Sequence, residues 1–422
     1  MDIFSKRRQF LSNQLESNSV AVLFGSEETL RNGDVNFPFR QNSDFSYLTN
    51  FPESESIAVL DREKFVIFCK EKNKLKEQWD GEITGPENAK LYGATQGIPI
   101  NDYEKVLPSL VKDRDNIYCF ESFIPKLKKL LPDLEAIIKP LDYEVSKMRT
   151  IKSADELKII EEACRISSLA HVRAMKSVKP GMYEYQLEAE YVHEFMSHGA
   201  RACAYPSIVG GGKNACVLHY NENKNILNDG DLVLVDAGCE FNNYASDITR
   251  TFPINGKFTK EQRDIYEIVL EASKKSIETV VSGSNPLKAH GTSVEIISQG
   301  LLDLGLLDGE LNEIVESNRY FDFYMHRVGH YMGLDVHDVG GKDMNGDWLD
   351  YAPGMITTIE PGIYINENLD VPDKYKNIGI RIEDNVVVTE TGFKVLTDLV
   401  PKEINDIESV SYTHLTLPTT ML

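Results

Sequence analysis

The sequence is poor in basic residues, cysteine and tryptophan, and it has no long apolar run. Its 422 residues hold 45 Lys and Arg against 66 Asp and Glu, which gives a formal net charge of −21. This balance argues against nucleic acid as the main partner, because proteins that bind polyanions usually carry a basic face. No apolar stretch approaches the roughly 18 residues that a membrane helix needs, so we expect no membrane partner.

Cysteine is scarce as well. The six cysteines are scattered and form no C-x-x-C pair, so in a chain of this length they are expected to be reduced and mostly buried. The first eight residues are largely charged and lack the apolar core of a signal peptide. Apolar residues nevertheless make up 41% of the chain, enough for a sizeable core. These features predict a cytoplasmic, multi-domain globular protein.

The N-terminal third alternates short apolar runs with helical stretches. Apolar runs at residues 20–24, 56–60 and 65–69 predict strands, and the stretch from Pro125 to Leu131, which Pro132 follows, predicts a short helix. Such alternation is typical of a domain built on one sheet. We therefore expect an α/β N-terminal domain over residues 1–150.

The sequence pattern changes at Ser153, where long helices are predicted to begin. Ser153 and Glu156 have the spacing of a capping box, which predicts that a helix begins there. Apolar residues continue at helical spacing to Leu169, and a second helix is expected from about Tyr183. We place the domain boundary just before Ser153.

The region that follows contains two similar strand pairs. The apolar run 232–236 ends on Asp236, and Asp247 opens a second run eleven residues later, a distance that suits a returning strand. Much later, the run 355–360 ends on Glu360, and the run 378–383 ends on Glu383. This repetition predicts two similar halves that face one another.

The last thirteen residues, 410–422, fit nothing before them. The first eleven of them look like the translation of a transposon adapter from sequencing-library preparation, so we treat 410–422 as a non-native tail. On this interpretation the natural sequence beyond about residue 409 is missing, and His414 is no ligand candidate.

The four acids pose a physical problem. A carboxylate at the end of a buried strand is costly unless it is paired or bound to metal. Any one of them alone is more often a helix cap or an ion-pair partner. Four acids in two matching strand pairs favour a cation site, because gathered carboxylates repel one another until a cation neutralises them.

Three of the nine histidines lie within twelve residues: His326, His330 and His337. His326 and His330 have the spacing of the zinc-protease motif H-E-x-x-H, but its Glu is absent and nearby glycines argue against a continuous helix. Three histidines among glycines are better explained by a functional site, and His219 is a fourth candidate. Three others fall on predicted helices and are expected to be structural or solvent-facing: His171, His193 and His198.

Four carboxylates and one histidine form an oxygen-rich set. Such a set suits two divalent cations of intermediate hardness, with Mn²⁺ ahead of Zn²⁺, and two such ions balance four carboxylates. The glycine-rich stretch 210–213 lacks the spacer and the Ser or Thr of a phosphate loop, so we expect a mobile loop near the cleft instead of a nucleotide site.

At this point the sequence resembles a known family. Asp236, Asp247, His330, Glu360 and Glu383 match, in order and context, the five metal ligands of the pita-bread metallopeptidases, and within them the chain most resembles the bacterial Xaa-Pro aminopeptidase (aminopeptidase P) group. Further matches lie at residues 37–49, 232–240 and 333–340, and the likeness covers nearly all of residues 1–409. It implies an α+β pita-bread catalytic domain with two pseudo-symmetric halves over residues 151–409.

The resemblance also implies roles for these side chains. Asp236 would bind one metal, Asp247 and Glu383 would bridge two, and His330 and Glu360 would complete the set. A hydroxide bridging the two metals would attack the peptide carbonyl before proline, with Glu360 as proton shuttle. His219 and His337 would flank the scissile bond, His326 would form a wall of the proline pocket, and Arg381 would orient a carboxylate or the substrate. The implied substrates are peptides with proline at position two.

Several alternatives stay open. A prolidase has the same five ligands but favours Xaa-Pro dipeptides, and non-catalytic pita-bread modules typically lose ligands that are present here. Creatinase-like hydrolysis does not use this metal set. The resemblance further implies a homo-oligomer, a dimer or a tetramer, in which Trp79 either contacts a neighbouring subunit or covers its own domain.

Overall fold

The computed structural model describes residues 2–132 and 134–415, without the side chains of 412–415. It divides into two compact units, with the division between Met148 and Arg149. Most of the tail predicted at 410–422 lies outside the described residues, and its first residues continue the last helix. Among the helices described, none has both the length and the apolar character needed to cross a membrane.

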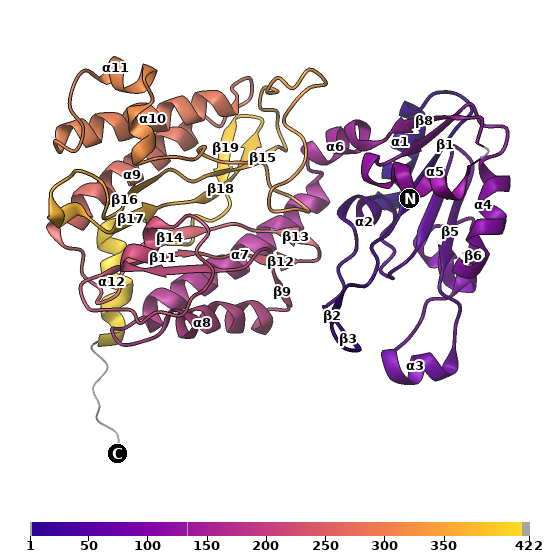
Figure 1. Cartoon of the computed structure of the whole chain (residues 1–422), viewed down its shortest axis with the longest axis horizontal. Helices are drawn as coiled ribbons and strands as arrows, with labels where there is room; N and C mark the ends of the chain where they lie inside the picture. The colour runs from indigo at the N-terminus through magenta and orange to yellow at the C-terminus, as the bar shows by residue number, and fades with distance from the viewer. Residues whose placement is uncertain (1, 133, 416–422) are drawn as a thin grey trace. The chain divides into compact units, whose positions relative to one another are not determined.

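The N-terminal unit is built on one mixed sheet of six strands, in the order β6-β5-β4-β1-β7-β8 (Figure 1). Strand β1 is antiparallel to β4 and parallel to β7. The strands β1, β4 and β5 are buried along their whole length, which explains their continuous apolar runs. Three strand predictions are thus confirmed, and the six strands span Ser19–Phe24 (β1), Ile57–Leu60 (β4), Phe65–Cys69 (β5), Gln96–Pro99 (β6), Asn116–Cys119 (β7) and Ile137–Pro140 (β8).

Helices and one small hairpin complete this unit. The short helix predicted from Pro125 is present as α5, with Pro125 in its first turn. The hairpin consists of β2 (Leu30–Asn32) and β3 (Val35–Asn36). The helices span Ile3–Gln14 (α1), Ser43–Thr49 (α2), Lys74–Asp80 (α3), Tyr103–Val111 (α4), Ile124–Leu130 (α5) and Asp142–Thr150 (α6).

Two long helices open the C-terminal unit, where the sequence predicts them. Helix α7 (Ala154–Ser177) begins with the capping box: the Ser153 hydroxyl accepts from the Glu156 N–H, and Glu156 accepts from the Ser153 N–H at 2.9 Å. Helix α8 (Glu184–Ser197) follows with Tyr183 at its N-cap. The two helices lie side by side in Figure 1.

The strands of this unit form four small sheets. Their orders are β10-β11-β14, β13-β12-β9, β15-β18-β19 and β16-β17. The first half contributes Ala202–Cys203 (β9), Ile208–Gly211 (β10), Leu232–Asp236 (β11), Cys239–Phe241 (β12), Tyr244–Ala245 (β13) and Thr249–Pro253 (β14). The second half contributes Ile356–Ile359 (β15), Gly362–Ile365 (β16), Ile378–Arg381 (β17), Asp384–Thr389 (β18) and Gly392–Val395 (β19).

The second strand pair differs in detail from the expectation. The predicted strand 378–383 ends at Arg381 as β17, and it pairs with β16 instead of β15. The partner of β15 is β18, which starts at Asp384, so Glu383 lies in the junction between two strands. The sequence repeat could not reveal the inserted β16–β17 pair.

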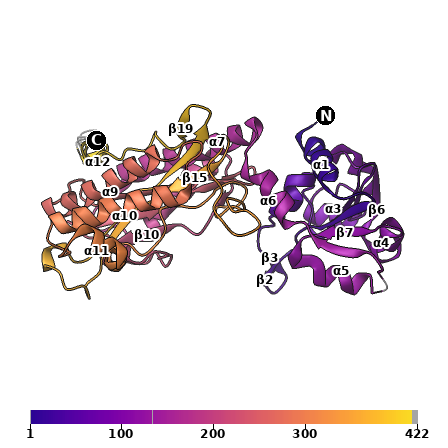
Figure 2. The ribbon, with the colours of Figure 1, turned by 90° about the horizontal axis from the view of Figure 1, so that it is seen from above.

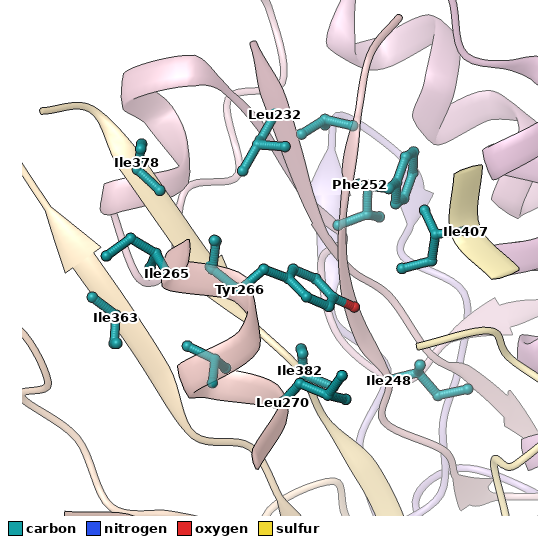
Figure 3. Close-up of a cluster of buried hydrophobic side chains, with 14 of the residues drawn as sticks. Leu232, Ile248, Phe252, Ile265, Tyr266, Leu270, Ile363, Ile378, Ile382 and Ile407 are labelled. Carbon is teal, nitrogen blue, oxygen red and sulfur yellow. The ribbon is translucent and has the colours of Figure 1, made fainter. Parts of the chain in front are cut away.

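Helix α9 (Lys260–Glu278) packs against strands from both halves. Figure 3 shows its residues Ile265, Tyr266 and Leu270 among buried side chains of β11, β14, β16, β17 and α12 (Ile404–Leu415). The Tyr266 hydroxyl donates to the backbone oxygen of Lys402 at 2.9 Å, so even the polar tip of this ring has a partner. Figure 2 shows α9 beside α10 (Pro286–Asp303), and α11 (Leu311–Glu316) follows.

One buried arginine joins the strands that carry the predicted acids. Arg250 of β14 is fully buried, and its guanidinium donates to the backbone oxygen of Glu383 at 2.6 Å and to Asp384 Oδ1 at 2.7 Å. It also donates to the backbone oxygens of Thr249, Val400 and Pro401. Lys402 donates to the other oxygen of Asp384 at 2.6 Å. Arg250 and Lys402 therefore hold the pKa of Asp384 below its usual value, although burial alone would raise it.

We expect Arg250→Met to lower the free energy of unfolding by about 3–5 kcal/mol, because it leaves one partner of a buried ion pair behind. Urea titration of the full chain, followed by circular dichroism, measures this change. As a control, Lys158→Met removes the exposed pair with Asp155 and is expected to leave the transition unchanged. Equal stability of the two variants would contradict the role given to Arg250.

Candidate metal centre

Strand register brings the four predicted acids to one place. Asp236, the last residue of β11, pairs with Thr249, two residues after Asp247. In the second half Ile359, just before Glu360, pairs with Asp384, just after Glu383. The two halves are joined where Thr249 Oγ1 donates to Glu383 Oε2 at 2.8 Å and the Glu383 N–H donates to the Thr249 oxygen at 3.0 Å. Each antiparallel strand pair, β11–β14 and β15–β18, thus places two carboxylates at the same end of the pair.

These acids line a cavity of about 450 Å³. All nine residues predicted from the sequence lie on its wall: His219, Asp236, Asp247, His326, His330, His337, Glu360, Arg381 and Glu383. The segment 325–338, which carries three of the histidines, forms no helix, as its glycines predict.

Asp247, His330 and Glu383 form the tightest group. Each offers one potential ligand atom, and these three atoms lie within 4.8 Å of one another. His330 Nε2 lies 3.3 Å from Asp247 Oδ2 and 3.6 Å from Glu360 Oε1. Its Nδ1 lies 3.0 Å from the Tyr331 backbone oxygen, so Nδ1–H donates there and Nε2 faces the carboxylates.

Asp236 is tied to the group by two side chains. The Tyr205 hydroxyl lies 2.6 Å from Asp236 Oδ1 and 2.5 Å from Asp247 Oδ1, so it bridges the two carboxylates. Arg381 Nη2 donates to Asp236 Oδ2 at 2.6 Å. Tyr205 was not predicted, because nothing in its local sequence pattern distinguishes it from a core tyrosine.

Burial and neighbouring charges shift the pKa values of these side chains. Burial raises the pKa of Glu360 to about 7 and that of Asp236 to about 6, against the lowering effect of Arg381 on both. Burial, with Asp247 and Glu360, also raises the pKa of Glu383. Burial disfavours protonated His330, but Asp247 and Glu360 outweigh it and raise its pKa to about 9.

The donor set fits divalent cations. In the structure, protons and Arg381 supply the positive charge that four buried carboxylates need, and the raised pKa values show how costly their negative charge is. Four carboxylates and one imidazole are oxygen-rich donors that suit divalent ions of intermediate hardness. The residues present therefore fit a metal centre.

Arg381 and His326 are linked through a residue that sequence reasoning missed. Arg381 Nη1 donates to the Tyr364 hydroxyl at 3.0 Å, and that hydroxyl lies 2.8 Å from His326 Nε2. His326 Nδ1 lies 2.8 Å from the Arg327 backbone oxygen, which can only accept. Nδ1 therefore carries the hydrogen, and Tyr364 donates to Nε2. Burial and the nearby Arg381 lower the pKa of His326 to about 3, so its ring is neutral.

His219 and His337 lie at the exposed edge of the cavity. The His337 ring is 4.3 Å from the His330 ring, edge to face. Burial and the charge of His330 lower the pKa of His337. Both side chains are therefore in a position to contact a molecule that enters the cavity.

Of the remaining histidines, His171 and His193 lie on helices as predicted and His198 is the C-cap of α8, whereas the glycine-rich stretch differs from expectation. His171 is buried on α7, where it contacts the Ala237 oxygen and the Tyr191 hydroxyl, and His193 lies on α8. Residues 210–213 end β10 and begin a 3₁₀ turn. A Cβ on Gly210 would lie 2.9 Å from the Asn214 backbone, so this stretch is tightly packed and is no mobile loop.

Fold and site together define a two-domain metallohydrolase. The model of metallopeptidase family M24 matches residues 158–390, and that of the aminopeptidase P N-terminal domain matches residues 4–118. The chain therefore belongs to family M24 and has its pita-bread fold, with the N-terminal domain found in aminopeptidase P.

Several known proteins are similar to this chain over nearly its full length. The Xaa-Pro aminopeptidase of Haemophilus influenzae is 44% identical and covers 96% of both chains. The structure of Pseudomonas aeruginosa aminopeptidase PepP is 43% identical, with a TM-score of 0.96 over 98% of both chains. Zinc-substituted Escherichia coli aminopeptidase P in complex with product is 39% identical, with a TM-score of 0.95 over 98% of both chains.

We expect the affinity of the protein for Mn²⁺ to fall as the pH is lowered from 9 to 6. Groups with raised pKa values, Glu360 at about 7 and His330 at about 9, bind protons over this range, and a metal must displace those protons. Calorimetric titration of chelator-treated protein at several pH values measures the effect. An affinity that does not change over this range would contradict it.

Proposed function

We propose that this protein is a metal-dependent Xaa-Pro aminopeptidase, which releases the N-terminal residue from peptides whose second residue is proline. The observation that carries the proposal is the single cavity that gathers four carboxylates, three of them buried, with four histidines and Arg381. The near full-length similarity to proteins of that name supports it.

In this proposal five side chains hold two divalent ions. Asp247 and Glu383, which belong to the tightest group of potential ligands, would be shared by the two ions, while Asp236, His330 and Glu360 would complete the set. When bound, the ions make water a stronger nucleophile and polarise the scissile carbonyl. The oxygen-rich set favours Mn²⁺, and the zinc-substituted relative indicates that a related site also accepts Zn²⁺.

The protein's own groups move the proton and hold the substrate. Glu360 accepts a proton from the attacking water and returns it to the proline nitrogen as the C–N bond breaks. His337 donates to the carbonyl oxygen as negative charge develops there, and His219, which also lines the cavity, contacts the substrate. The Xaa-Pro bond has no N–H, so these groups must recognise the carbonyl and the ring.

His326 and Arg381 have positioning roles in this scheme. Because Tyr364 and the Arg327 oxygen occupy both ring nitrogens, His326 presents a fixed, neutral face that suits the apolar proline ring. Arg381 holds Asp236 on one side and Tyr364 on the other, so one guanidinium orients both a ligand and the pocket wall.

The proposal extends to assembly and location. Trp79 of α3 is 88% exposed and Leu75 is 72% exposed, so the alternative that Trp79 covers its own domain does not hold. We propose that α3 packs against a second copy of the chain in a dimer or tetramer. All six cysteines are unpaired, as expected of a cytoplasmic protein.

The substrate test compares three peptides: Xaa-Pro-Yaa, Xaa-Ala-Yaa and the dipeptide Xaa-Pro. With Mn²⁺ present, we expect release of free Xaa and intact Pro-Yaa from the first and little cleavage of the second. Mass spectrometry of the products measures both. Preference for the dipeptide would identify a prolidase instead. Asp247→Ala, prepared in the same way, is the control for contaminating peptidases and is expected to be inactive.

A second test separates metal ligands from groups that contact the substrate. We expect His337→Ala to lower kcat by about 10²–10³-fold, the usual cost of losing one donor to a developing oxyanion. Its metal content, measured by mass spectrometry, stays at the wild-type value, whereas Asp247→Ala loses both metal and activity. Loss of metal from His337→Ala would assign this residue to the metal set.

A further inference from the structure

The candidate substrate contact His219 lies in a segment without regular structure. Residues 217–225 contain neither helix nor strand, and most of their side chains are exposed. Segments of this kind usually move more than the elements they connect. A side chain that acts on a bound substrate must be held in place, since a displacement of about 1 Å can cost roughly 10²-fold in rate. Something must therefore fix this segment.

Glu184, the first residue of α8, makes the contacts that do so. Its side chain is fully buried and accepts four hydrogen bonds. Oε1 accepts from the Gly211 N–H and from Asn214 Nδ2, both at 2.9 Å. Oε2 accepts from the Tyr220 hydroxyl at 2.7 Å and from the Asn225 N–H at 2.8 Å.

These four donors lie on both sides of His219 in the sequence. Two precede it, at the end of β10 and in the turn after it, and two follow it. The Glu184 backbone adds a fifth bond, because its N–H donates to the Asn225 oxygen at 2.9 Å. One carboxylate thus ties both ends of the His219 segment to the first turn of a long helix, where negative charge is also favoured by the helix dipole.

A neighbouring side chain adds further hydrogen bonds to this anchor. Asn223 accepts from the Val209 N–H at 3.0 Å and donates to Glu188, one turn further along α8, at 2.9 Å. Burial and the bond to Glu184 raise the pKa of Tyr220 to about 12, so its hydroxyl stays a donor at ordinary pH.

We propose that Glu184 is a positioning residue of the reaction: its four hydrogen bonds fix the segment 211–225 against α8 and thereby set where His219 lies in the cavity. This inference rests on the proposed function, because the position of His219 matters only if His219 acts on the substrate. Glu184 does not line the cavity, so its effect on catalysis passes through His219.

The test is Glu184→Gln, which keeps the volume of the side chain. An amide offers one accepting oxygen and places an NH₂ group against two of the four donors, so the anchor is broken on one side. With an Xaa-Pro-Yaa peptide, we expect kcat/KM to fall by roughly 10- to 100-fold while metal content stays unchanged. The matched control is Glu190→Gln on the same helix, whose partner is Arg173 on α7, and it is expected to retain wild-type kinetics.

A double-mutant cycle with His219→Ala shows whether the effect passes through His219. We expect Glu184→Gln to change the rate of the His219→Ala enzyme little, because the group it positions is already gone. The same fold-loss in both backgrounds, or wild-type kinetics of Glu184→Gln, would overturn the inference. An inactive wild-type enzyme would instead overturn the proposed function.

Tyr220→Phe provides the second variant in case Glu184→Gln does not fold. It removes one of the four donors and leaves the carboxylate in place. We expect a smaller loss of kcat/KM than for Glu184→Gln, and again no further loss in the His219→Ala background. A loss that persists undiminished in that background would count against positioning through His219.

Discussion

The electrostatic cost of four buried carboxylates governs the architecture of the C-terminal unit. Arg381 and a protonated His330 supply two positive charges against the four negative charges of the acids, so two remain to be compensated. Burial and this uncompensated negative charge raise the pKa values of Glu360 and Glu383, so these groups hold protons more tightly. A divalent cation would neutralise the carboxylates more completely than protons do. The same repulsion that would destabilise an ordinary core thus makes this group of side chains fit a divalent cation.

Carboxylates that repel one another stay close together only where the backbone that carries them is fixed. Asp236 lies at the end of a paired strand, and a slip of one residue would turn it to the opposite face of the sheet. Arg250 of β14 restrains Glu383, because its guanidinium binds the backbone oxygen of Glu383 and the side chain of Asp384. Helix α9 covers strands of both halves, so packing and hydrogen bonding fix the same geometry.

Strand ends, helix starts, the four acids and the four cavity histidines could be predicted because each leaves a local signal, whereas Arg381 was named only through the family resemblance. The acids follow or precede apolar runs, and Ser153 shows its capping box directly. Tyr205, Tyr364 and Glu184 left no such signal, since their roles depend on partners many residues away: Asp236, His326 and the segment around His219. The insertion of β16 and β17 between β15 and β18 was hidden for the same reason. Long-range pairing is a property of the folded chain, and periodicity does not encode it.

The side chains of the site are held by two kinds of backbone structure. Metal-ligand candidates lie at or beside strands, whereas His219 and His337 lie on irregular segments that must be anchored separately. Glu184 anchors the first, and Asp338, next to His337, is buried against Arg149 and Lys152 and anchors the second. In both segments a buried carboxylate that accepts hydrogen bonds on both oxygens holds the loop at a position where its histidine can face the cavity. Buried charges of this kind add little to stability compared with apolar packing, but their directional bonds specify one conformation of a loop that apolar contacts alone would leave variable.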